Sequence, residues 1–345
     1  MVTVVSFAVD NVLGGTGAWE TAANWSQGTK PTATDGYVTV LNATSPATCT
    51  LGANAVCNAF DCSTFTGLLV RSTFSISVYG NIILNGTLNT SGTGNLAVVI
   101  SSQITSNGFV WPTTFNTGAT TKTITFLDDF YCVNFTYGNT VNTVTINGGD
   151  VYISGNCVNA GLTTGTCDGS ADLIFIGTGT ISTVNATTGK ITNNITINTA
   201  GTITFGTIVS YGGGGIMTKT AGTIETTGST LNVGNCTLNL ADLTLNNLTI
   251  NVASATVTLS SGLKVAGTFT NTATIGVPQT INSSSVGVQR ALVMLAGSTH
   301  TLNYLNATDI NSSAGLPVYS IGGVLNNTLN WYNAFATSNF FLMFE

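Results

Sequence analysis

The sequence predicts an all-β fold, a right-handed parallel β-helix (β-solenoid) with coils of about 22 residues. Three observations predict it: a very low charge content, a recurring Gly-Thr-apolar phrase, and short stretches that alternate apolar and polar residues. Asp, Glu, Lys and Arg make up 6% of the 345 residues, while the hydrophobic share is 43%. A typical soluble domain is about 25% charged. The missing charge is replaced largely by Thr, Asn, Ser and Gly, which suit strand surfaces and tight turns.

The same composition excludes several classes of protein. A disordered chain combines low hydrophobicity with high net charge, and neither holds here. A membrane-spanning helix needs about 18 consecutive apolar residues, and the sequence has no such run, so we expect no membrane insertion. The net charge is −6 with only seven Lys and Arg. Nucleic-acid binding requires basic residues that neutralise phosphates, so we expect no nucleic-acid partner.

The repeat is carried by Gly-Thr followed by an apolar residue. This phrase begins at Gly179, Gly201, Gly222 and Gly267, at intervals of 22, 21 and 45 residues. An earlier copy at Gly86 lies 93 residues before Gly179, close to four coils. A fixed period of this size is the signature of a solenoid, in which each repeat contacts only its neighbours. A tandem of β-sandwiches would instead repeat at about 100 residues.

Between these phrases the sequence alternates with period two, as in Val144-Thr-Ile146, Leu243-Thr-Leu245 and Val257-Thr-Leu259. Such segments predict short strands with one buried face. Stacked coils then place apolar side chains inside, and ladders of Thr, Ser and Asn outside. Like charges stacked between neighbouring strands repel, which accounts for the low charge content.

The two ends differ in composition from the middle, and the chain divides accordingly. We expect a cap or attachment segment over residues 1–36, which contains Trp19 and Trp25. A β-helix shaft follows over 37–285, and residues 286–345 form the terminal coils, a C-terminal cap and a Phe-rich tail. Capping is needed because open sheet edges invite aggregation.

The seven cysteines are odd in number, irregularly spaced and without a CxxC pair, which argues against zinc. We expect them to be buried free thiols, with a Cys57–Cys62 disulfide as the alternative. They are Cys49, Cys57, Cys62, Cys132, Cys157, Cys167 and Cys236.

Motifs at the two ends resemble a known family. The N-terminal residues are Trp19, Asn24-Trp25-Ser26, Pro31, Asp35 and Val38-x-Val40, and the C-terminal ones are Leu302-Asn-Tyr304-Leu305, Asp309-Ile-Asn311, Gly322-Gly323 and Asn330-Trp331. This pattern is similar to the parallel β-helix tail-fibre and tail-spike-like structural proteins of tailed bacteriophages. The resemblance implies a virion component, commonly a homotrimer, that binds other virion proteins and a host surface.

The N-terminus carries neither a basic region nor an apolar region followed by a cleavage site, so no secretory signal is predicted. We therefore expect synthesis in a cytoplasm without a signal peptide, and an extracellular location as part of a virion after release.

An enzyme is the alternative, because parallel β-helices include polysaccharide lyases and hydrolases. Glycoside hydrolysis needs two carboxylates about 5–10 Å apart, and the candidates are Asp128 with Asp129, and Asp168 with Asp172. We interpret them as turn residues that make local hydrogen bonds. His300, the single histidine, is interpreted as a polar residue of the terminal coils. The sequence thus predicts no catalytic, metal or cofactor site.

The favoured hypothesis is a non-catalytic structural virion protein, a tail fibre, spike or capsid decoration, that attaches to a host surface. A self-assembling extracellular adhesin or filament subunit is a further alternative. The candidate contacts to a host glycan or to another subunit are aromatic: Trp111, Tyr211, Tyr332, Phe340, Phe341 and Phe344.

Overall fold

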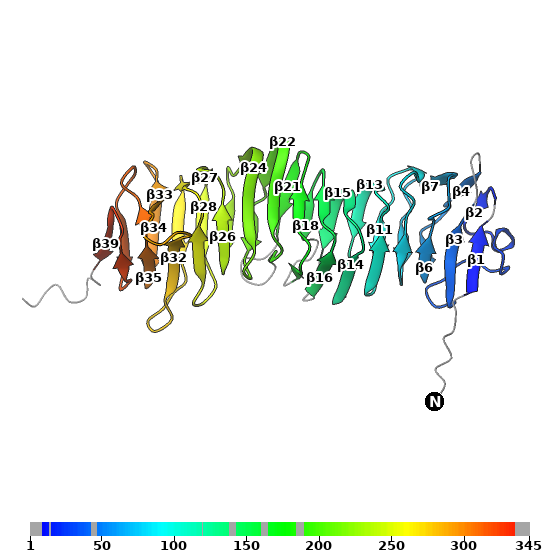
Figure 1. Ribbon diagram of the computed structural model, residues 1–345, viewed down its shortest axis with the longest axis horizontal. Coiled ribbons are helices and arrows are strands. Elements are labelled where there is room, and N and C mark those ends of the chain that lie inside the picture. The colour runs from blue at the N-terminus through cyan, green and yellow to red at the C-terminus, as the bar shows by residue number, and fades with distance from the viewer. Residues whose placement is uncertain are drawn as a thin grey trace, which may run out of the picture. The chain divides into compact units, whose positions relative to one another are not determined.

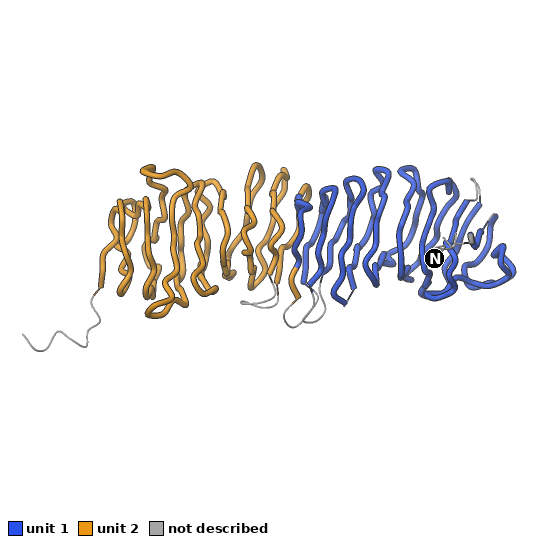
Figure 2. The backbone as a smooth tube through the Cα atoms, turned by 60° about the horizontal axis from the view of Figure 1, so that its bottom comes forward, with its two compact units in different colours: residues 1–161, 167–174 blue, residues 162–166, 175–345 orange. Residues whose placement is uncertain are grey.

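The computed structural model describes residues 9–13, 15–42, 47–118, 120–137, 143–159, 165–183 and 190–334. The chain divides into two compact units (Figure 2). Unit 1 comprises Met1–Gly161 and Cys167–Ile174, and unit 2 comprises Leu162–Thr166 and Phe175–Glu345. Each unit is a stack of parallel coils, so the predicted parallel β-solenoid is confirmed (Figure 1). The helical content of the described residues is one short 3-10 turn, η1 (Ala22–Asn24).

The described strands of unit 1 fall in three parallel sheets, and successive coils supply the neighbouring strands of each sheet. The first contains β1 (Val9–Leu13), β3 (Tyr37–Leu41), β6 (Ala59–Asp61), β9 (Ile82–Ile83), β12 (Ser102–Thr105), β14 (Lys122–Phe126), β16 (Thr143–Gly148) and β19 (Thr166–Asp168). The second contains β2 (Gly17–Ala18), β4 (Thr48–Thr50), β7 (Leu68–Val70) and β10 (Asn89–Ser91). The third contains β5 (Ala55–Cys57), β8 (Ile76–Val78), β11 (Leu96–Val98), β13 (Val110–Asn116), β15 (Phe130–Tyr137), β17 (Val151–Ile153), β18 (Cys157–Asn159) and β20 (Leu173–Phe175).

Unit 2 is built in the same way. Its longest sheet contains β21 (Gly179–Ser182), β22 (Ile195–Phe205), β24 (Ile216–Glu225), β26 (Cys236–Asn239), β29 (Thr256–Leu259), β32 (Gln279–Ser283), β35 (Leu305–Thr308) and β38 (Leu325–Asn326). A second contains β23 (Ile208–Tyr211), β25 (Thr230–Val233), β28 (Asn247–Ile250), β31 (Thr268–Asn271), β34 (Thr299–Asn303), β37 (Val318–Ile321) and β39 (Trp331–Ala334). The third contains β27 (Leu243–Leu245), β30 (Leu263–Val265), β33 (Arg290–Met294) and β36 (Ile310–Asn311).

Strand register confirms the coil length. In unit 1, Phe60 pairs with Ile82, Ile82 with Ile104, and Ile104 with Phe126, each step being 22 residues. All four side chains are at most 1% exposed, so they form a continuous apolar ladder inside the coils. Burial of such a side chain contributes about 1.5–3 kcal/mol, and the alternation of the strands places one in every coil.

Asparagine side chains link neighbouring coils at their corners. In unit 1, Asn54 Oδ1 accepts the backbone N–H of Ser75 at 3.0 Å, and Asn81 Oδ1 that of Gln103 at 2.9 Å. The same bond recurs in unit 2 from Ile216 N–H to Asn194, Thr256 to Asn235 and Thr268 to Asn247. Each bond joins residues 21 or 22 positions apart. The abundance of asparagine therefore has a structural cause, because its amide oxygen satisfies a backbone donor of the next coil.

The N-terminal segment contains a strand, β1, which pairs in parallel with β3. Trp19 and Trp25 are both buried, with ring centroids 5.0 Å apart, and Trp25 Nε1 donates to the backbone oxygen of Trp19 at 2.8 Å. The Trp19 ring also lies 6.2 Å from that of Phe60, on the apolar ladder of unit 1.

All seven cysteines are buried and unpaired, which confirms that they are free thiols. The alternative Cys57–Cys62 disulfide does not occur. Burial raises the pKa of the Cys62 and Cys236 thiols to about 12.

Candidate functional site

Three stacked rings, two exposed tyrosines and a partly buried histidine, form a ladder on the second sheet of unit 2. His300 lies on β34, Tyr319 on β37 and Tyr332 on β39. The His300 and Tyr319 ring centroids are 5.9 Å apart with 13° between their planes. The Tyr319 and Tyr332 centroids are 5.5 Å apart with 31° between their planes. We call these three residues the ring ladder.

Strand register and alternation place the two tyrosines of the ring ladder on the outer face. Tyr319 and Tyr332 are direct partners in the parallel pair β37–β39. Their neighbours Val318 and Trp331 also pair and point inward, with 0% and 5% of their surface exposed. Because successive side chains of a strand point to opposite faces, the tyrosines point outward, and they are 46% and 49% exposed.

A backbone hydrogen bond orients the imidazole of the ring ladder. Nε2 of His300 accepts the backbone N–H of Tyr319 at 3.0 Å. This bond requires an unprotonated Nε2. Partial burial of the imidazole lowers the pKa of His300 below its usual value. Both effects favour the neutral ring, which stacks on Tyr319 without a charge to desolvate.

A shallow hollow of about 190 Å³ adjoins the ring ladder. Its lining combines apolar and uncharged polar side chains: His300, Thr301, Leu302, Asn303, Tyr319, Ile321 and Ala334. No carboxylate, lysine or arginine is among them. The surface thus combines flat apolar ring faces with neutral hydrogen-bonding groups.

The structure separates the aromatic residues that the sequence singles out. Tyr332 belongs to the ring ladder, whereas Trp111 and Tyr211 are 0% and 1% exposed. A ring that contacts a glycan or another subunit must have an accessible face. Trp111 and Tyr211 are buried in the core, so neither ring has one. Phe340, Phe341 and Phe344 lie outside the described residues.

Two of the four candidate catalytic carboxylates, those of Asp128 and Asp129, accept backbone hydrogen bonds from other coils. Oδ1 of Asp128 accepts the N–H of Ser106, and its Oδ2 accepts that of Asn107, both at 2.6 Å. Asp129 Oδ1 accepts the N–H of Asp150 at 3.1 Å. In turn, Asp150 Oδ1 accepts the N–H of Asp172 at 3.1 Å. These aspartates occupy the role that asparagine has at other corners.

Asp168 lies on β19 and is only partly exposed. Within the described ranges, no group of three or more His, Cys, Asp or Glu side chains is placed to hold a metal ion.

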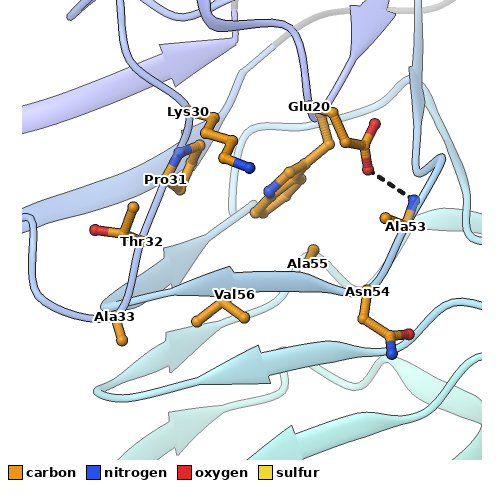
Figure 3. A pocket seen from close by; sticks show the side chains of 10 residues that line it. Glu20, Lys30, Pro31, Thr32, Ala33, Ala53, Asn54, Ala55 and Val56 are labelled. Atoms are coloured by element: carbon orange, nitrogen blue, oxygen red, sulfur yellow. Dashed lines mark hydrogen bonds between the residues drawn. The ribbon is translucent and has the colours of Figure 1, made fainter.

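A second hollow, of about 220 Å³, lies in unit 1 beside Trp19 (Figure 3). Lys30 and Glu20 lie on opposite sides of it, and small side chains such as Ala33 and Ala55 line the rest. Oε1 of Glu20 already accepts the N–H groups of Gly52 and Ala53 at 2.9 and 3.0 Å. The carboxylate therefore connects a loop to the first coils. Because it already accepts these two hydrogen bonds, we regard this hollow as a weaker candidate for ligand binding than the ring ladder.

Sequence reasoning misses two members of the ring ladder, because it interprets His300 as a polar residue of the terminal coils and does not single out Tyr319.

Comparison of the chain with protein families, curated proteins and solved structures gives no match. Among the described residues, no helix has the length and hydrophobicity of a membrane span.

Proposed function

We propose that this chain is a non-catalytic structural protein of a phage-like particle, a tail fibre, spike or capsid decoration, and that it attaches to a host surface by binding a neutral glycan at the ring ladder. The observation that carries the proposal is the stack of two outward tyrosines, Tyr319 and Tyr332, on the partly buried ring of His300, beside an uncharged hollow. The resemblance of both ends to phage β-helix proteins supports the virion part.

The chemistry of the ring ladder fits a sugar. An aromatic face binds the apolar C–H face of a sugar ring, while a tyrosine hydroxyl remains available for hydrogen bonds. Two of the rings are about half exposed, and stacking in register holds them in a fixed orientation. Little conformational entropy is then lost on binding. The absence of charge in the hollow's lining favours a neutral sugar over a uronate or sulfated one.

One such surface binds a sugar weakly, and attachment to a cell requires several. A homotrimer would present three ring ladders at once, and linked sites raise the overall avidity by about 10²–10⁴. We therefore propose a homotrimer as the working assembly. Light scattering of the purified protein checks this: three chains support it, a stable monomer argues against it, and open filaments would favour the adhesin alternative.

The test of glycan binding compares four variants on an array of neutral and anionic bacterial surface glycans. Tyr319→Ala and Tyr332→Ala should each weaken binding at least tenfold, whereas Tyr332→Phe should retain most of it because the ring face remains. The matched control is Tyr152→Ala, which disrupts another stacked pair, Tyr131 with Tyr152, whose ring centroids are 4.5 Å apart in unit 1.

Two outcomes would reject the proposal. The first is a wild-type protein that binds no glycan on the array. The second is a glycan that the Tyr319→Ala and Tyr332→Ala variants bind as well as the wild type does. Cleavage of a bound polysaccharide would instead favour the enzyme alternative.

A further inference from the structure

A change of coil length in unit 2 leaves part of a strand without a neighbour. Strands β22 and β24 are unusually long, with 11 and 10 residues. Between β23 and β25 the register advances by 22 residues, from Ile208 to Thr230. Between β25 and β28 it advances by only 17, from Thr230 to Asn247. The coil after β24 is therefore about five residues short.

The missing residues would have paired with the second half of β24. Residues 216–218 of β24 pair with β26, whereas 219–225 pair on one side only, with β22. Figure 1 shows β22 and β24 extending beyond β26 at the top of the view. Within the described range 190–334, no backbone hydrogen bond joins residues 219–225 to residues 240–246.

The short coil turns away from this edge and is held in place elsewhere. Ala241 and Asp242 have φ values of 50° and 59°, in the left-handed region. The N–H of Asp242 donates to the backbone oxygen of Gly262 at 2.9 Å, in the following coil. The turn is thus bonded to the following coil, and it contacts the end of β24 through the bond from Thr226 Oγ1 to the backbone oxygen of Thr244 at 2.8 Å.

A hollow of about 450 Å³ occupies the space that the short coil leaves. Its lining follows the open edge and the turn: Lys219, Gly222, Thr223, Ile224, Glu225, Thr226, Thr227, Ala241, Asp242, Leu243 and Thr244. In a strand, successive backbone groups point to opposite sides. The backbone groups of 219–225 that do not point toward β22 therefore lie on the side of this hollow.

We propose that the open edge of β24 is a docking site for an extended segment of a partner protein, which adds as one strand of five to seven residues. Unpaired strand edges bind extended peptides through main-chain hydrogen bonds, and the side-chain neighbours supply specificity. The length follows from the segment 219–225, which is paired on one side only. The hollow is bounded by the coils on either side of it, so it admits a single strand more readily than a second solenoid.

Charges at the two ends of the edge define the chemistry of this segment. Lys219 stands at one end, and Glu225 and Asp242 stand at the other. Hydrogen bonds from Thr227 lower the pKa of the Glu225 carboxyl, so that it stays ionised. Opposite charges on neighbouring strands attract and like charges repel. The fitting segment therefore has an acidic residue next to Lys219, a basic residue next to Glu225, and uncharged residues between.

Gly222 keeps the edge in position without filling the hollow. Its φ is +85°, and a Cβ there would lie 2.5 Å from the backbone oxygen of Thr199, on the β22 side. The crowding is thus on the paired side of β24, and the hollow side remains free for another strand.

The experiment titrates the purified full chain with a fluorescent seven-residue peptide, Asp-Thr-Val-Thr-Val-Thr-Lys. Two further peptides carry N-methyl groups on one or the other alternate set of residues. Each N-methyl group removes one backbone donor. We expect the unmodified peptide to bind, one N-methylated set to weaken binding at least tenfold, and the other to change it less than twofold. Hydrogen exchange should show new protection in 219–225 on binding.

Protein variants test the charges. Lys219→Glu should weaken binding about threefold, as expected for one cross-strand charge pair turned repulsive. The matched control Lys264→Glu, on β30 outside the hollow, should leave binding unchanged. The proposal is overturned if the unmodified peptide does not bind at 1 mM, if both N-methylated sets bind as it does, or if protection falls outside 219–225.

Discussion

Replacement of Asp128 by alanine should destabilise unit 1 by about 3 kcal/mol. The carboxylate accepts two N–H groups of the preceding coil, those of Ser106 and Asn107, at 2.6 Å each. Ser106 is fully buried, so its donor would be left without an acceptor. A hydrogen bond to a charged group contributes about 1.5–3 kcal/mol, and an unsatisfied buried donor costs about 1–3 kcal/mol. Asp128→Asn keeps one acceptor oxygen and should lose about half as much.

The assay is urea unfolding followed by tryptophan fluorescence. Three of the four tryptophans, Trp19, Trp25 and Trp111, belong to unit 1. With a slope of about 3 kcal/mol per molar urea, the midpoint of Asp128→Ala should fall by about 1 M. The control is Asp61→Ala, because Asp61 Oδ1 accepts only the nearby, exposed N–H of Ser63 at 2.8 Å. An Asp128→Ala midpoint equal to that of Asp61→Ala would refute the structural role and reopen the catalytic one.

Three further predictions concern buried polar groups. Arg71→Ala should cost about 3 kcal/mol or more and shift the fluorescence of Trp111, because the fully buried guanidinium lies 4.6 Å from the Trp111 ring centroid and donates to surrounding oxygens. Burial raises the pKa of the Cys236 thiol from 9.0 to about 12, so its stabilising contribution is complete below pH 9 and is lost as pH rises toward 12. Between pH 8 and pH 10, the free energy of unfolding should therefore fall by about 1.4 kcal/mol less for Cys236→Val than for the wild type. An equal fall in the two proteins would contradict this. Burial lowers the pKa of Lys122 from 10.5 to about 8, so its contribution becomes more favourable as pH rises from 8 to 10.5. Between pH 8 and pH 10, the free energy of unfolding of Lys122→Met should fall by about 2 kcal/mol relative to that of the wild type, because the variant lacks this gain. Urea unfolding at both pH values measures the difference.

Much of the fold is predictable from sequence because it depends on local patterns. The alternation in Val144-Thr-Ile146 and Val257-Thr-Leu259 specifies which side chains are buried, and the structure buries all four apolar residues. The Gly-Thr phrase specifies the coil length because equivalent positions of successive coils must stack. The abundance of asparagine at the corners has the same origin, since each coil presents equivalent backbone N–H donors there.

The ring ladder is not predictable in this way because the terminal coils depart from the period. Tyr319 and Tyr332 are 13 residues apart, and His300 and Tyr319 are 19 apart. A search at 22-residue intervals cannot bring them together. Trp111 shows a second limit: it follows Val110, which is 52% exposed, and two adjacent apolar residues do not reveal which one points inward. A register shift between Trp111 and Thr114 obscures the pattern further.

The corner asparagines have a direction that bears on how the chain folds during synthesis. In each of these bonds the acceptor comes first in the chain, as with Asn54 before Ser75 and Asn235 before Thr256. A ribosome adds about 5–20 residues per second, so a coil of about 22 residues emerges roughly every 1–4 s. Each new coil therefore meets amide oxygens that the previous coil already holds in place, and the chain can add coils in the order in which they are translated.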